Sequence, residues 1–179
     1  KRKHQALSRE KEVRLSRIDR SRDAHFMREA LVEAAKARQA GEVPVGAVVV
    51  DKEGSIIGRG HNCVVAGHDP SGHAEIIALK NASQNLKNYR LDNCTIYVTL
   101  EPCCHYGKTP PCADLIASKN LERVVVAMQD PNPLVSGKGI RKLKDAGIFV
   151  TTGVMEKEAQ VLNEVFMKFI TEKKPFVLY

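Results

Sequence analysis

The chain has 179 residues, 43% of them hydrophobic and 27% charged, with a formal net charge of +7 at pH 7. This length and composition predict one globular domain and exclude a disordered or fibrous protein. The longest apolar stretch, residues 45–50, is too short to cross a bilayer, so no membrane partner is expected.

Basic residues gather at the N-terminus. Residues 1–22 hold nine lysines and arginines but only three acidic residues, so most of the net charge lies there. We interpret 1–22 as a basic N-terminal extension and 23–179 as the functional domain. The extension has only a weak helical stripe, which is typical of a solvated or partner-docked helix. Its charged start shows no secretory signal.

Hydrophobic periodicity predicts helices and strands that alternate along the chain. We expect a helix over 23–40 and two strands, 45–51 and 55–59, joined as a hairpin. The predicted elements then follow as a helix over 73–86, a strand over 95–100, a helix over 112–119, a strand over 123–128, a helix over 139–145, a strand over 148–151 and a helix over 156–170. The helix between the last two strands makes them parallel. Together these elements predict a three-layer α/β/α sandwich around a mixed five-stranded sheet.

Five cysteines, at positions 63, 94, 103, 104 and 112, do not form an even disulfide framework. Two of them occupy candidate metal-ligand positions instead. Disulfides persist in oxidising compartments, so this usage indicates a reducing compartment, and we expect the cytoplasm.

One histidine and two cysteines carry the chemistry. His73, Cys103 and Cys112 supply three zinc ligands and leave the fourth position of the metal free for water. Glu75, two residues after the histidine, is placed to carry the protons of a hydrolysis. The pattern H-x-E with P-C-x-x-C is typical of zinc-dependent base deaminases. In this chain the second cysteine follows the first by nine residues rather than three.

The predicted chemistry sets conditions on each residue. Both cysteines bind as thiolates, and the zinc acidifies its bound water to a pKa of about 7. Glu75 then takes the proton and returns it, first to a ring nitrogen and then to the departing amine. Two residues subtend about 200° on a helix, so His73 and Glu75 reach one site only where a helix begins.

Two alternatives stay open at this point. Cys104 is a candidate fourth ligand, which would make the zinc site structural. A non-catalytic, zinc-stabilised binding module is the second alternative. Adjacent cysteines rarely both reach one metal, which argues against Cys104. Glu75 argues against the binding module, because a structural site has no need of a carboxylate beside an open position.

The chain resembles the cytidine deaminase-like superfamily. Its first part, from Phe26 to Cys103, is similar to bacterial tRNA adenosine deaminases in the stretches 41–48, 60–62, 68–70, 73–75, 88–91 and 97–103. From Thr99 onward it is similar to the pyrimidine deaminase domain of riboflavin biosynthesis in the stretches 103–112, 130–134 and 137–140. The riboflavin enzymes carry Pro-Asn-Pro before the first strand, with an asparagine that helps hold the substrate. This chain has Glu42-Val43-Pro44 there, so that contact is missing or made by another group.

The resemblance implies a zinc enzyme, with His73, Cys103 and Cys112 as ligands and Glu75 as the catalytic residue. It also implies that Asn62, His105 and Lys108 bind substrate. The favoured reaction is hydrolytic deamination of the ribosylaminopyrimidine phosphate intermediate of riboflavin biosynthesis, because a lysine near His105 suits an anionic phosphate. The alternative is adenosine-to-inosine deamination in a tRNA anticodon loop, which the first part of the chain and the basic extension favour. The resemblance further implies a homodimer.

Overall fold

The computed structural model describes residues 20–107, 109–133 and 135–172. Residues 1–19 of the predicted basic extension, the predicted substrate contact Lys108 and the last seven residues lie outside this part. Within it, no helix is both long and apolar enough to span a membrane.

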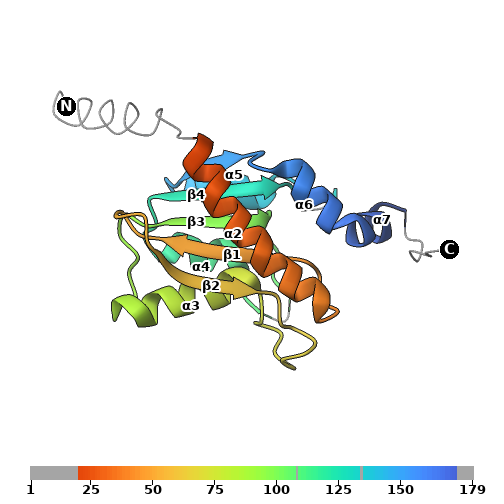
Figure 1. Ribbon diagram of the computed structural model, residues 1–179, viewed down its shortest axis with the longest axis horizontal. Helices are drawn as coiled ribbons and strands as arrows, with labels where there is room; N and C mark the ends of the chain where they lie inside the picture. Colours follow the sequence, from red (N-terminus) through yellow and green to blue (C-terminus); the bar gives the residue numbers. More distant parts are fainter. Residues whose placement is uncertain (1–19, 108, 134, 173–179) are drawn as a thin grey trace.

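Helices and strands alternate along the described chain (Figure 1). Their bounds are α2 Arg20–Gln39, β1 Gly46–Val50, β2 Ile56–His61, α3 Ala74–Leu86, β3 Thr95–Leu100, α4 Cys112–Ser118, β4 Arg123–Met128, α5 Lys138–Asp145, β5 Phe149–Thr152, α6 Glu156–Leu162 and α7 Glu164–Glu172. The bounds of β3 and β4 are those predicted from the sequence, and most of the others differ by one to three residues.

The five strands form one mixed sheet in the order β2-β1-β3-β4-β5. Strand β1 is antiparallel to both β2 and β3, whereas β3, β4 and β5 run parallel to one another. The predicted hairpin and the predicted parallel pair are both confirmed. The carboxyl ends of β3 and β4 therefore meet at one edge of the sheet, where open α/β sheets commonly bind their ligands.

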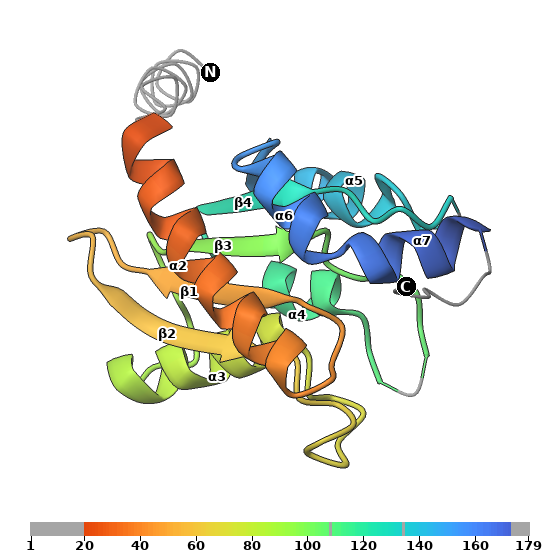
Figure 2. The ribbon, with the colours of Figure 1, turned by 45° about the vertical axis from the view of Figure 1, so that its right-hand side comes forward.

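Helices cover both faces of the sheet. Helices α2 and α6 contact each other and the central strands, while α3 contacts β1 and β2 and is followed on that face by α4 and α5. Figures 1 and 2 show α2 lying across one face and α3 on the opposite side. The predicted three-layer sandwich is confirmed.

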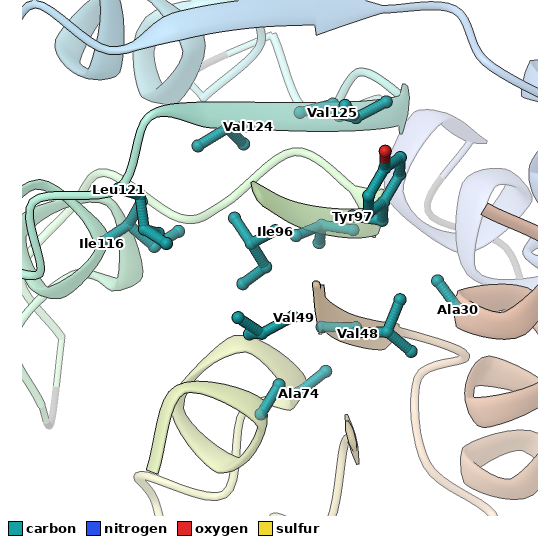
Figure 3. Packing of buried hydrophobic residues seen from close by; sticks show 14 of the residues in the cluster. Ala30, Val48, Val49, Ala74, Ile96, Tyr97, Ile116, Leu121, Val124 and Val125 are labelled. Atoms are coloured by element: carbon teal, nitrogen blue, oxygen red, sulfur yellow. The ribbon is translucent and has the colours of Figure 1, made fainter. Parts of the chain in front are cut away.

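The core follows the alternation of side chains along the strands. Val48, Tyr97 and Val125 are neighbours across three strands, and they face α2 near Ala30 (Figure 3). The residues next to them in each strand, Val49, Ile96 and Val124, point to the other face, toward α3 and α4. Strand β4 is buried over five of its six residues, as its run of three valines predicts.

A glycine in β2 brings the start of α3 close to the sheet. A Cβ atom at Gly60 would lie 2.4 Å from the Ala74 carbonyl oxygen, so no other residue fits without displacing the helix. This close approach seats the first turn of α3, which carries the predicted catalytic residue.

The prediction of a single last helix is wrong. The sequence pattern indicates one helix over 156–170, but the structure has two, α6 and α7, separated at Asn163. Asn163 is fully buried, and its side-chain amide donates to the Pro44 carbonyl oxygen at 2.9 Å and to Ala159 at 3.1 Å. This contact with the segment before β1 interrupts the helix. Helix α2 also begins at Arg20 rather than at residue 23, which places residues 20–22 of the predicted extension in the fold.

Candidate metal and catalytic site

The three predicted zinc ligands converge beyond the carboxyl end of β3. Cys103 follows β3, His73 is the residue before α3, and Cys112 is the first residue of α4. Their ligand atoms all lie within 4.8 Å of one another. Three segments that are distant in the sequence thus present one imidazole nitrogen and two sulfurs to a common point.

The donor set fits zinc. Ligands of a tetrahedral zinc, with bonds of about 2.0–2.3 Å, lie about 3–4 Å apart, so these side chains need only small movements to bind it. Cys104 is not part of the group. Three protein ligands with an open fourth position are typical of a catalytic zinc site rather than a structural one.

The two cysteines share one proton between them. The Cys112 thiol donates to the Cys103 sulfur and, with a further hydrogen bond from His73, lowers the pKa of Cys103 to about 4. The same pairing, together with burial, raises the pKa of Cys112. The backbone N–H of Cys112 also donates to the Cys103 sulfur at 3.2 Å. Cys103 is thus a thiolate in the metal-free protein, and a dication would displace the remaining proton from Cys112.

Glu75 lies in the first turn of α3 and is only 4% exposed. Burial raises its pKa to about 7, and the negative charge on Cys103 acts in the same direction. His73 has extended backbone angles, φ −78° and ψ 144°, so it lies just outside the helix. His73 and Glu75 therefore both lie at the start of α3, the position that their shared site requires. A carboxyl group with a pKa near neutrality can both accept and donate protons at cellular pH.

A pocket of about 430 Å³ opens beside the ligands. This volume suits a small molecule. One wall is the loop after β2, a second wall is the ligand loop, which we define as residues 104–111, and the floor includes two zinc ligands. The lining residues are Val64, His68, Pro70, His73, Cys103, His105, Gly107 and Thr109.

The structure places two of the three predicted substrate contacts. His105 lies in the pocket wall, as expected for a substrate contact. The Asn62 side-chain oxygen accepts the Ala74 N–H at 3.0 Å at the start of α3, and Asn62 is not among the residues that line this pocket. Lys108 belongs to the ligand loop but lies outside the described residues.

Two buried glutamates beside the pocket escaped the sequence reasoning. Glu42 is 8% exposed, and its Oε1 atom accepts the backbone N–H groups of Val65 at 2.7 Å and Ala66 at 2.9 Å. It therefore holds the loop that contains Val64, one of the pocket-lining residues. Glu101 binds backbone amides on the other side of the site. The only signal for Glu42 is that it stands where the riboflavin enzymes carry Pro-Asn-Pro.

Residues 20–128 match the family described as the cytidine and deoxycytidylate deaminase zinc-binding region. The riboflavin biosynthesis protein RibD of Aquifex aeolicus is 48% identical over 160 residues, covering 87% of this chain and 41% of the relative. The chloroplastic riboflavin biosynthesis protein PYRD of Arabidopsis thaliana is 40% identical over 177 residues, covering 96% of this chain and 37% of the relative. The chain spans about two-fifths of the length of these relatives.

Two solved structures extend the comparison. The Thermotoga maritima diaminohydroxyphosphoribosylaminopyrimidine deaminase/5-amino-6-(5-phosphoribosylamino)uracil reductase superposes with a TM-score of 0.76 at 41% identity, covering 88% of this chain and 43% of that chain. A structure from a study of A-to-I editing by tRNA:A34 deaminases has a TM-score of 0.67 at 34% identity, covering 77% of this chain and 98% of that chain. This chain therefore belongs to the deaminase family defined by the cytidine and deoxycytidylate deaminase zinc-binding region.

Proposed function

We propose that this chain is a zinc-dependent deaminase that removes an exocyclic amine from the ribosylaminopyrimidine phosphate intermediate of riboflavin biosynthesis. The observation that carries this proposal is the ligand loop. The nine-residue spacing between Cys103 and Cys112 gives room for His105, Gly107 and Thr109 to line the pocket beside the zinc ligands. The substrate is thereby met by a loop that the shorter P-C-x-x-C pattern lacks.

The relatives support this choice of substrate. The riboflavin biosynthesis proteins are similar over both parts of the chain, including the part that resembles tRNA adenosine deaminases. Identity reaches 48% for the Aquifex aeolicus protein, against 34% for the tRNA:A34 deaminase structure. The pocket volume of about 430 Å³ suits a ribosylated pyrimidine.

His73, Cys103 and Cys112 would hold the zinc, which supplies a Lewis acid that activates a water molecule as the nucleophile. Glu75 accepts a proton from that water and delivers it to a ring nitrogen while the water oxygen bonds to the amine-bearing ring carbon. A second proton passes through Glu75 to the amine, the carbon–nitrogen bond breaks, and ammonia leaves as a carbonyl forms. The burial that raises the Glu75 pKa suits both transfers.

An ammonia-release assay tests the proposal. The zinc-loaded protein is offered the ribosylaminopyrimidine phosphate and, in parallel, a tRNA anticodon stem-loop with adenosine at the wobble position. We expect ammonia from the pyrimidine and none from the RNA. Inosine formation in the RNA with no reaction of the pyrimidine would overturn the assignment in favour of tRNA editing.

The likeness to the tRNA:A34 deaminase structure makes tRNA the second candidate substrate. The basic residues at 1–22 could neutralise RNA phosphates under this alternative. Deleting residues 1–22 would then weaken tRNA binding. It would also make the tRNA affinity depend less steeply on salt concentration than in the full chain. Under the pyrimidine assignment, the deletion leaves kcat/KM for the pyrimidine unchanged.

We also propose that the chain forms a homodimer in the cytoplasm. A groove of about 490 Å³ between α3 and α4 has Ile76 and Leu115 among its lining residues, and the exposed Tyr89 stands at its side. These helices begin at the zinc ligands, so a second copy seated here would lie beside the pocket. Light scattering coupled to gel filtration tests the dimer. We expect the wild type to be a dimer and Leu115→Glu to be a monomer, and a monomeric wild type would contradict the proposal.

All five cysteines are free thiols, which supports a reducing compartment.

A further inference from the structure

Glu101 is a buried carboxylate that the proposed chemistry does not use. It follows β3, lies two residues before the ligand Cys103, and is 3% exposed. Its carboxylate accepts three backbone N–H groups, from Asp130 at 3.3 Å, Gly137 at 2.8 Å and Ile140 at 3.1 Å. These donors lie 29 to 39 residues further along the chain. A carboxylate saturated by amides in this way holds distant backbone segments in place.

The contact fixes the start of α5. Gly137 precedes α5 with a φ of 77° and has no side chain to cap the helix, so Glu101 supplies the missing acceptor from another element. A Cβ atom at Gly139 would lie 2.1 Å from the Pro102 carbonyl oxygen and 3.2 Å from Glu101 Oε1. The first turn of α5 is thus pressed against the two residues that precede Cys103.

The same helix reaches the ligand loop further along. Lys142 of α5 forms an ion pair with Asp114 of α4, and its ammonium group lies 5.9 Å from the centre of the Tyr106 ring. The Tyr106 hydroxyl donates to Asp114 at 3.1 Å. Tyr106 stands between His105 and Gly107, both of which line the pocket. Helix α5 therefore contacts both sides of Cys103. Its start is bound by Glu101, which precedes Cys103, and its Lys142 lies beside Tyr106 of the ligand loop, which follows Cys103.

The segment after β4 is drawn toward the pocket by the same carboxylate. Asp130 is one of the three residues whose amides bind Glu101, and its side chain accepts the Asn132 N–H at 2.8 Å. Burial raises the pKa of Asp130, and the negative charge of Glu101 acts in the same direction.

We propose that Glu101 is a positioning residue, which through α5 and the Tyr106–Asp114–Lys142 contacts holds the ligand loop in the conformation that receives the substrate. The effect expected on KM rests on the proposed function, whereas the effect expected on the rate of amide hydrogen exchange does not. The substitution Glu101→Gln keeps the shape of the side chain but replaces one acceptor oxygen with an NH₂ group. That group would face a backbone N–H donor, so at least one of the three contacts is lost.

Asp23→Asn is the matched control. Asp23 is 2% exposed and accepts the Tyr97 hydroxyl at 3.0 Å and the Arg123 guanidinium at 2.8 and 2.7 Å. It is therefore an equally buried carboxylate that accepts as many of the hydrogen bonds described here, located where β4 begins rather than where it ends. Any general effect of weakening a buried carboxylate appears in both variants, and only Glu101→Gln alters the ligand loop.

Three measurements on the zinc-loaded full chain test the proposal: zinc content, amide hydrogen–deuterium exchange, and steady-state kinetics with the pyrimidine. In Glu101→Gln we expect one equivalent of zinc, at least tenfold faster exchange in peptides covering 104–111 and 130–140, and a KM raised about tenfold with a smaller change in kcat. In Asp23→Asn these peptides and KM stay as in the wild type. Unchanged exchange in 104–111 of Glu101→Gln overturns the proposal.

A second variant keeps the test decisive if Glu101→Gln does not fold. Lys142→Met removes the charge at the far end of the same chain of contacts, and Lys144→Met, in the same turn of α5, is its control. We expect faster exchange in 104–111 and a KM raised two- to fivefold for Lys142→Met only. Equal behaviour of the two lysine variants would overturn the proposal. Failure of the wild type to release ammonia from the pyrimidine would instead overturn the proposed function and leave the exchange result standing.

Discussion

The two ends of the central strands treat buried charge in opposite ways. Where β4 begins, Asp23 is neutralised by a two-pronged contact with Arg123 and by the Tyr97 hydroxyl. Where β3 and β4 end, Glu75 is equally buried, and burial raises its pKa to about 7. The Asp23 carboxylate is thus paired with a cation, whereas the Glu75 carboxyl group lies in an environment that favours its protonated form.

This difference separates stability from chemistry. Removing one partner of a buried ion pair such as Asp23–Arg123 leaves an uncompensated charge and so destabilises the fold. An underpartnered carboxylate costs folding free energy but is available for proton transfer. We therefore expect substitutions at the start of β4 to change the free energy of unfolding with little effect on turnover. Substitution of Glu75 at the other end should do the reverse.

Glu75→Gln gives the largest expected effect. The amide fills the same volume but cannot carry a proton, so kcat should fall by about 10²- to 10⁴-fold, the usual contribution of a general acid–base group. Zinc content measured by atomic absorption should stay at one equivalent, because His73, Cys103 and Cys112 are untouched. Loss of zinc from this variant would make Glu75 a metal ligand and contradict its role.

Asp23→Asn tests the opposite end. Removing the charge leaves Arg123 buried without its counter-ion, a loss that costs about 3 kcal/mol in folded proteins. For a chain of this length that corresponds to a fall in Tm of roughly 6–12 °C. Calorimetry and the ammonia assay at 20 °C measure the two consequences, and we expect kcat/KM to stay within twofold of the wild type. A proportionate loss of activity would show that the two ends are coupled.

Lys108→Ala tests the ligand loop itself. Lys108 lies outside the described residues, but it belongs to the loop that places His105 in the pocket wall. A charged hydrogen bond to a phosphate contributes about 1.5–3 kcal/mol, so KM for the phosphorylated pyrimidine should rise by at least tenfold. Lys52→Ala, in the turn between β1 and β2, is the control. An equal KM for the phosphorylated and dephosphorylated substrates in the wild type would contradict a phosphate contact.

The kind of contact that each residue makes explains which features could be predicted from the sequence. The convergence of His73, Cys103 and Cys112 was predictable because zinc chemistry restricts residue types and spacing, and β3 and β4 were predictable because their buried residues are continuous. Glu42 and Glu101 were not, because each binds backbone amides more than 20 residues away, and backbone donors leave no mark in a sequence. The break between α6 and α7 was missed for a similar reason, since it depends on the contact of Asn163 with Pro44.

The smallest expected effect concerns pH. Burial alone would raise the pKa of Glu33, but hydrogen bonds from Lys36 at 2.8 Å and His61 at 3.2 Å lower it below its ordinary value. A lowered carboxyl pKa stabilises the fold above the unfolded-state value, and this contribution is lost as the pH falls through the folded-state value. Glu33→Gln should therefore lower Tm at pH 7 by a few degrees and converge on the wild type once the pH has fallen through the folded-state pKa of Glu33. In metal-free protein, Glu75→Gln should show the opposite trend, because a raised pKa removes stability as the pH increases from about 4.5 to 7. Thermal melts of the two variants across this range would measure both slopes, and slopes of the same sign would contradict the contrast between the paired and the underpartnered carboxylate.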